Sequence, residues 1–225
     1  MSKRLKQAKE KIESGKLYNI EEAIELVKET SQVKFDASVE VHINLGIDPQ
    51  KGDQIVRGSV ILPNGTGKKL KIAAFVTEDK IEQIKKAGAD IVGADDLINK
   101  IKKTNKTDFD IAITVPEMMK NLAVIARILG QKGLMPKPKT GTIGSDLEKI
   151  IGELKQGKIS YKNDDTANIH IIIGKISFDN KALIENFNTF LKSLRKIKPN
   201  SLKTTFINTI TITSSMGPGI KVQPN

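Results

Sequence analysis

The spacing of apolar residues changes twice along this chain of 225 residues. Between residues 38 and 45 apolar and polar side chains alternate, the pattern of a strand with one buried face, and the apolar positions are Val39, Val41, Ile43 and Leu45. Between residues 70 and 129 short apolar stretches alternate with helical ones, which is typical of a small parallel α/β sheet. From residue 159 the strand-and-turn pattern returns. We therefore expect the two ends of the chain to fold together around an inserted middle segment.

This pattern predicts two domains of different class. Residues 1–66 and 160–225 form a discontinuous α+β domain, and residues 67–159 form an inserted α/β domain. The chain is long enough to give each domain its own hydrophobic core.

Turn residues in the two end segments predict two antiparallel hairpins. The first joins the strand ending at Leu45 to residues 55–62 across Asp48-Pro49, and the second joins residues 159–162 to residues 168–173 across Asn163-Asp164-Asp165. The end segments should also contain helices at 3–14, 20–30 and 180–197 and a strand at 205–213. The middle segment should contain strands at 70–76, 91–92 and 109–115 and helices at 79–87, 95–103, 117–129 and from Ser145-Asp146 onward.

Basic residues exceed acidic ones in both predicted domains. The whole chain has 37 lysines and arginines against 26 aspartates and glutamates, a formal net charge of +11. Residues 1–66 hold ten of each sign, residues 67–159 eighteen basic and twelve acidic, and residues 160–225 nine and four. This excess favours a polyanionic partner, nucleic acid first and an anionic membrane surface second. A solvated lysine-rich surface without a partner is the alternative.

Several classes of chemistry have no support in the sequence. The chain has no cysteine, so disulfides, thiolate nucleophiles and sulfur-ligated zinc are excluded. Its beginning is charged and no apolar run approaches the roughly 20 residues of a membrane span. We expect a cytoplasmic protein that is neither exported nor membrane-spanning.

An α/β segment with glycines also suggests a nucleotide-dependent enzyme, but its motifs are incomplete. Residues 64–68 (NGTGK) resemble the end of a P-loop, yet Leu62 stands where the first glycine is required and Lys69 where serine or threonine is required. His42 and His170 lie far apart in the sequence, so we expect a structural or surface role for each. No catalytic residue, metal site or cofactor is expected.

The segment from Lys34 to Pro49 (KFDASVEVHINLGIDP) closely resembles the opening of the L1 family of ribosomal proteins. The resemblance covers nearly the whole chain, in matching order, through Val56-Arg57-Gly58, Leu62-Pro63, Ala87-Gly88-Ala89-Asp90, Arg127-Ile128-Leu129-Gly130, Gly133-Leu134-Met135-Pro136, Asn163-Asp164, Gly174-Lys175 and Ser215-Met216-Gly217-Pro218.

This resemblance implies that the inserted domain is Rossmann-like and that the protein is a structural component of the ribosome and not an enzyme. Family members bind 23S rRNA at the mobile L1 stalk of the 50S subunit, assist movement of deacylated tRNA at the exit site, and in bacteria repress translation of their own operon mRNA. The implied protein is a monomer when free and needs no cofactor. A nucleotide-dependent α/β enzyme and a generic RNA chaperone are the alternatives.

The resemblance also implies an RNA-binding surface on the first domain. Ser38 and Glu40 lie opposite the apolar face of their strand, where they can form hydrogen bonds with ribose hydroxyls. Judged from spacing alone, Phe35 and Met216 are instead core residues and Glu40 a surface acid. The implied RNA-binding residues are Lys34, Phe35, Ser38, Glu40, Asp164, His170, Ser215, Met216 and Gly217.

Three lysines in the Gly/Pro-rich loop of the inserted domain, Lys132, Lys137 and Lys139, are predicted secondary RNA contacts. The sequence departs from the family pattern at two places: Gln131-Lys132 replaces the usual Pro-Arg before Gly133 in this loop, and in the Asn163-Asp164 turn of the first domain Asp165 stands where many relatives carry a basic residue. Glycines near both predicted domain boundaries permit large backbone changes, so we expect hinges at Gly65, Gly67 and Gly157.

Overall fold

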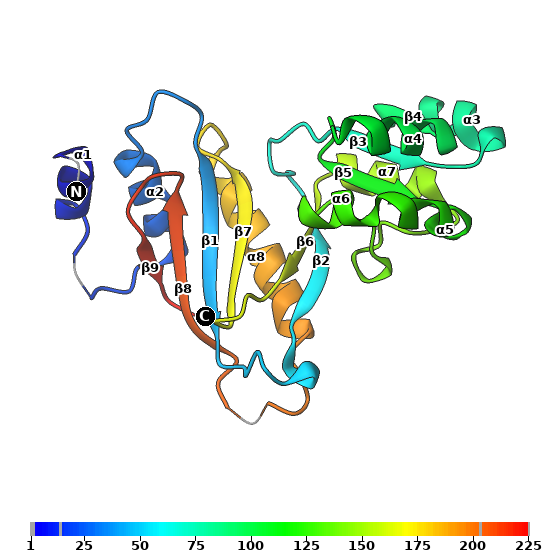
Figure 1. Ribbon diagram of the computed structural model, residues 1–225. Helices are drawn as coiled ribbons and strands as arrows, with labels where there is room; N and C mark the ends of the chain where they lie inside the picture. The colour runs from blue at the N-terminus through cyan, green and yellow to red at the C-terminus, as the bar shows by residue number, and fades with distance from the viewer. Residues whose placement is uncertain (1–2, 14, 203, 225) are drawn as a thin grey trace. The chain divides into compact units, whose positions relative to one another are not determined.

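The computed structural model describes residues 3–13, 15–202 and 204–224. The chain divides into two compact units (Figure 1), which are described separately. Unit 1 comprises residues 1–67 and 159–225, and unit 2 comprises residues 68–158. Each of these boundaries lies one residue from the position that the sequence predicts.

Unit 1 is built on a four-stranded antiparallel sheet in the order β7-β1-β8-β9. β1 (Ser38–Leu45) lies between β7 (Asn168–Lys175) and β8 (Ile207–Ser214), and β9 (Ile220–Val222) pairs with β8. Thus the two segments that form unit 1 are interleaved within one sheet, because a strand from the first segment has both neighbours from the second. The short strand β9 is absent from the sequence prediction.

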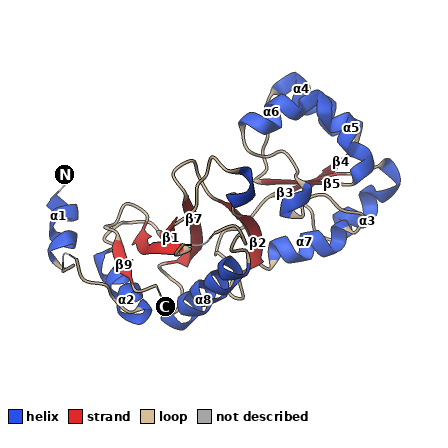
Figure 2. Ribbon diagram, turned by 90° about the horizontal axis from the view of Figure 1, so that it is seen from below, coloured by secondary structure: helices blue, strands red, loops and turns tan. Residues whose placement is uncertain are grey.

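Two helices cover one face of this sheet. α2 (Ile20–Thr30) and α8 (Asn180–Lys196) pack against each other and against the strands, as Figure 2 shows. The alternation in β1 explains this arrangement, because its apolar side chains point toward the helices and are fully buried. A further helix, α1 (Lys3–Glu10), lies near the start of the chain.

The prediction of two antiparallel hairpins, one following β1 and one preceding β7, is wrong. β2 (Arg57–Ile61) pairs with β6 (Lys158–Lys162) in a separate two-stranded sheet, and not with β1 or β7. β1 already has a partner on each side, so it has no free edge for β2. The connection after β1 contains a 3₁₀ turn, η1 (Gly52–Gln54), and residues 163–167 likewise form a local turn where the second hairpin was expected.

Unit 2 contains a three-stranded parallel sheet in the order β4-β3-β5, which confirms the predicted α/β class. β3, the first strand of unit 2, is central, as in doubly wound sheets. Figure 2 shows helices on both sides of this sheet. The elements are β3 (Ile72–Phe75), η2 (Glu78–Lys80), α3 (Ile81–Lys86), β4 (Ile91–Gly93), α4 (Asp95–Thr104), β5 (Ile111–Thr114) and α7 (Leu147–Lys155).

Two predicted helices differ from the structure. The helix expected at 117–129 is a series of short α and 3₁₀ segments: η3 (Pro116–Met118), α5 (Met119–Leu122), η4 (Ala123–Ile125) and α6 (Ala126–Gln131). α1 ends at Glu10, before the predicted end at Ser14, which lies outside the described residues. The loop that follows α6 contains η5 (Pro138–Thr140). Over the described part of the chain, no helix combines the length and apolar character needed to cross a membrane.

Candidate nucleic-acid interface

The face of the unit 1 sheet opposite α2 and α8 carries mainly polar side chains. Strand register places them in three rows that cross β7, β1 and β8. The apolar exception is Ile172, which is 40% exposed. The rows are Ile172, Glu40 and Thr213; His170, His42 and Thr211; and Asn168, Asn44 and Thr209.

Ser38, Glu40 and Ser215 form one hydrogen-bonded group at the end of this face. Ser215 Oγ donates to Glu40 Oε1 at 3.1 Å, and the Ser38 N–H donates to Ser215 Oγ at 3.3 Å. Lys175 Nζ donates to Ser38 Oγ at 2.9 Å. The turn after β8 is therefore fixed to the start of β1, and a lysine from β7 joins the group.

The turn after β8 presents Met216 to solvent. Its side chain is 71% exposed, and its φ of 64° lies in the left-handed region. Gly217 packs closely against Ser214: a Cβ at this position would lie 2.3 Å from Ser214 Oγ and 3.2 Å from the Ser214 carbonyl oxygen, so a larger residue would displace the Ser214 side chain. Phe35, before β1, is 54% exposed. Phe35 and Met216 are thus not the core residues that spacing alone would suggest.

A second polar group crosses the middle of the face. The Nδ1 atoms of His42 and His170 lie 2.7 Å apart, so one donates a hydrogen bond to the other. His42 Nε2 lies 3.7 Å from Glu40 Oε2. Burial, together with the adjoining His170, lowers the pKa of His42 from its ordinary value of 6.5. The His42 imidazole is therefore mainly neutral at neutral pH.

Asp164 organises the turn beside this histidine pair. Its Oδ1 accepts the backbone N–H of Asn168 at 2.7 Å and that of Thr166 at 2.9 Å, and its Oδ2 lies 3.4 Å from His170 Nε2. The Asn168 N–H is the main cause of a strongly lowered Asp164 pKa, because it stabilises the carboxylate form. Asp164 thus remains ionised across the physiological range.

A continuous series of contacts therefore joins residues from three separate parts of the chain, running from Asp164 through the two histidines and Glu40 to Ser215. Met216 and Gly217 adjoin its Ser215 end in the chain, and Lys34 and Phe35 are exposed just before β1. Sequence reasoning missed His42 and Lys175 as members of this surface. Both stand in motifs that carry the family resemblance, but only strand pairing shows that they lie beside the predicted residues.

Comparison with known proteins gives a consistent family assignment. The model of the family described as "Ribosomal protein L1p/L10e family" matches residues 27–218. The chain belongs to the ribosomal protein L1 family. Among its relatives, "Large ribosomal subunit protein uL1" of Mycoplasma capricolum is 48% identical, with 99% of this chain and 98% of the relative covered.

Two further L1 relatives carry the same name. The protein of Mesoplasma florum is 49% identical over 100% of this chain and 99% of the relative. That of Corynebacterium glutamicum is 49% identical over 98% of this chain and 93% of the relative. This L1-family chain is accordingly not an enzyme.

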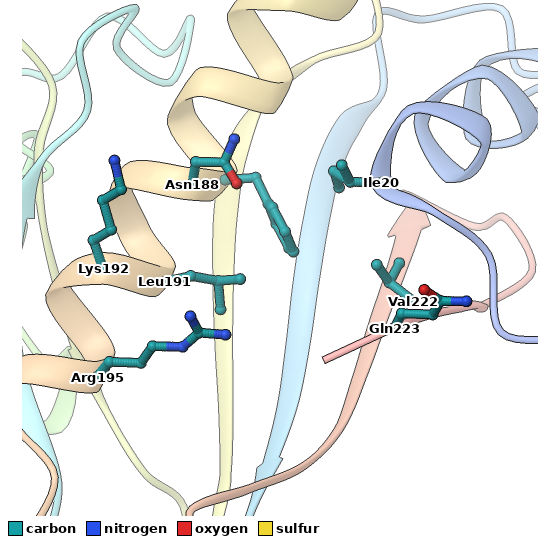
Figure 3. A pocket seen from close by; sticks show the side chains of 8 residues that line it. Ile20, Asn188, Leu191, Lys192, Arg195, Val222 and Gln223 are labelled. Carbon is teal, nitrogen blue, oxygen red and sulfur yellow. The ribbon is translucent and has the colours of Figure 1, made fainter. Parts of the chain in front are cut away.

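The helical side of unit 1 has a shallow pocket between α8 and the β9 region (Figure 3). Its lining combines apolar side chains, such as Leu191 and Val222, with the cations Lys192 and Arg195. At about 100 Å³ it is smaller than the ~300 Å³ at which small-molecule sites begin. This pocket does not provide the site that a nucleotide-dependent enzyme would need.

The predicted secondary contacts all belong to unit 2. Lys132 Nζ donates to Thr107 Oγ1 at 2.8 Å and to the Asn105 carbonyl at 3.2 Å. Its side chain therefore stabilises the loop at residues 105–107. The Lys137 side chain is exposed. The side chain of Lys139 lies outside the described residues.

Proposed function

We propose that the protein binds 23S rRNA at the L1 stalk of the large ribosomal subunit through the polar sheet face of unit 1. The observation that carries this proposal is the joined group of Ser38, Glu40 and Ser215, which lies next to the exposed Met216. Membership of the L1 family supports it independently.

The chemistry of this face suits irregular RNA. Hydroxyl and carboxylate oxygens can accept hydrogen bonds from ribose 2′-hydroxyls, which distinguish RNA from DNA. The exposed side chains of Phe35 and Met216 can pack against a base or the apolar side of a ribose. Because hydrogen bonds already hold the polar groups in place, little ordering entropy is lost on binding.

Positive charge supplements these contacts. Unit 1 carries a net charge of +5, since its first segment is balanced and its second has nine basic and four acidic residues. Two of these charges lie beside β1: Lys34 is exposed just before the strand, and Lys175 of the neighbouring strand β7 contacts Ser38. Phosphate neutralisation at such lysines strengthens binding without reading sequence.

The same surface accounts for the further roles that the family resemblance implies. A messenger RNA that presents a similar fold would compete for it, which would permit repression of the protein's own operon. Unit 2, with a net charge of +6, is the part that we assign to exit-site tRNA or neighbouring rRNA. In this proposal the protein is monomeric when free and acts in the cytoplasm as part of the ribosome.

Two substitutions test the assigned surface. We expect Met216→Ala and Ser215→Ala each to weaken binding to an L1-stalk RNA fragment by about fivefold, since a lost hydrogen bond or apolar contact is worth ~1 kcal/mol. Equilibrium binding assays measure the effect, and thermal unfolding checks that the variants remain folded. Val124→Ala is the matched control, because Val124 is 57% exposed but belongs to unit 2. Unchanged affinity in both test variants would refute the site.

A further inference from the structure

His42 and His170 face each other on the polar sheet, although 128 positions separate them in the chain. With 2.7 Å between their Nδ1 atoms, one nitrogen carries a proton and the other a lone pair. If solvent carries that proton from Nδ1 to Nε2 of the same ring, the ring stays neutral and both Nδ1 atoms present a lone pair on the same side of the sheet. Neighbouring nitrogen ligands of this kind form a chelating pair for a metal ion.

The outer nitrogens of both rings lie near carboxylates. His170 Nε2 is 3.4 Å from Asp164 Oδ2, and His42 Nε2 is 3.7 Å from Glu40 Oε2. A carboxylate beside Nε2 favours the tautomer with its proton on Nε2, which leaves Nδ1 available as a ligand. Metal-binding histidines commonly have such carboxylate partners, and these partners fix the ring and increase its basicity.

We propose that His42 and His170 bind a divalent transition metal ion of the zinc, copper or nickel class through their Nδ1 atoms. These are the ions that imidazole ligands suit best. Side-chain exposures of 33% for His42 and 54% for His170 leave the metal position open to solvent. Water completes the coordination, because no group of three or more His, Cys, Asp or Glu side chains around one point occurs within the described residues.

Chelation requires two adjustments of the observed geometry. Zinc lies about 2.0–2.1 Å from an imidazole nitrogen, so two nitrogens on one zinc are about 2.8–3.4 Å apart at angles between a right angle and tetrahedral. The two Nδ1 atoms would have to separate by up to about 0.7 Å from their present 2.7 Å, and the rings would have to turn so that both lone pairs point at the metal and not at each other. Both side chains point away from the core, so these movements displace no buried group.

Zinc titration of the full-length, RNA-free protein tests the proposal. The chain has two histidines and no cysteine, so the background from other strong ligands is low. Calorimetry near neutral pH should show one saturable equivalent of Zn²⁺. His42→Asn and His170→Asn should each weaken zinc binding at least as much as loss of an outer carboxylate partner does, that is by ~10–100-fold. Asn44→Ala, on the same face of β1, is the control and should leave zinc affinity unchanged.

A second measurement does not depend on the folding of any variant. In the wild-type protein, ¹⁵N NMR of the imidazole rings should show that Zn²⁺ shifts the Nδ1 signals of both histidines. The proposal is overturned if no saturable binding occurs, if His42→Asn and His170→Asn bind zinc as tightly as the wild-type protein, or if the Nδ1 signals do not respond. Stalk-RNA binding measured in the presence of a chelator is separate, so failure of the metal site would be distinguished from failure of the proposed RNA surface.

Discussion

At the scale of single residues, Met216 combines backbone strain with an exposed apolar side chain. Its φ of 64° is costly for a residue with a Cβ, by about 1–2 kcal/mol, and its side chain is 71% exposed and so gains little from burial. The turn is held by the Ser215 N–H bonded to the Ser38 carbonyl at 3.0 Å and the Gly217 N–H bonded to the Ser214 carbonyl at 2.8 Å. Strain at an exposed position is typical of residues retained for binding.

Replacing Met216 by glycine should affect the stability of the protein and its RNA binding in opposite directions. Met216→Gly should leave the free energy of unfolding unchanged or raise it by up to about 1 kcal/mol, because glycine adopts positive φ without a steric cost. Its affinity for stalk RNA should fall, because the apolar contact is lost. Chemical denaturation and RNA titration measure the two quantities. Met216→Ala should lose affinity without gaining stability, since it keeps a Cβ. A clear loss of stability in Met216→Gly would contradict the assignment of strain.

At the scale of elements, the sequence predicted β1 and its polar face but not its neighbours. Alternation is a local property of the chain, so it showed correctly that Ser38 and Glu40 face away from the core. Pairing depends on contacts between distant segments, and the turn signals after β1 suggested the wrong partner. For this reason the contact between His42 and His170 could not be found before the register of β1 and β7 was known.

A carboxylate with a lowered pKa, that of Asp110, hydrogen-bonds to the residue just before β3 of unit 2. Asp110 accepts hydrogen bonds from Lys68 Nζ at 2.7 Å and from the Lys71 N–H at 3.0 Å, and these bonds, that of Lys68 first, lower its pKa below the ordinary 3.8. The carboxylate form is therefore stabilised by folding. Its contribution is present at neutral pH and is lost as pH falls below about 4 toward the folded-state value.

Asp110→Asn should lower the free energy of unfolding at pH 7 by less than about 1 kcal/mol, because the Asp110 side chain is one-third exposed and solvent screens the ion pair. Urea unfolding between pH 7 and pH 3 measures the pH dependence. The stability difference between wild type and variant should shrink as the pH is lowered through this range. A difference that stays constant with pH would show that Asp110 does not act through its charge.

At the scale of the whole molecule, glycines mark the connections between the two units. Gly65, Gly67 and Gly157 have φ values of 63°, 72° and 99°. The Gly65 carbonyl accepts a hydrogen bond from the buried Asn186 Nδ2 at 2.9 Å, and Gly67 packs closely against Phe178. The outgoing connection is thus attached to unit 1 as far as Gly67. We propose that movement between the units begins just after that residue and near Gly157 on the return.

Independent motion of the units has a direct signature in solution. We expect ¹⁵N NMR relaxation of the free protein to give different rotational diffusion parameters for residues 68–158 and for the remainder. The reason is that two short connections containing glycines join the units, and such connections allow the units to rotate separately. A single diffusion tensor that fits both units would contradict the hinge proposal.

The central claim is that unit 1 recognises the shape of stalk RNA, and binding to two RNAs tests it most directly. Affinity for the L1-stalk fragment of 23S rRNA is measured beside affinity for an unrelated RNA helix of equal length, at several salt concentrations. We predict a large preference for the stalk that persists at high salt, because hydrogen bonds and apolar contacts are screened less than phosphate contacts. Equal affinities with the same steep salt dependence would contradict the claim and would indicate a generic basic RNA-binding protein.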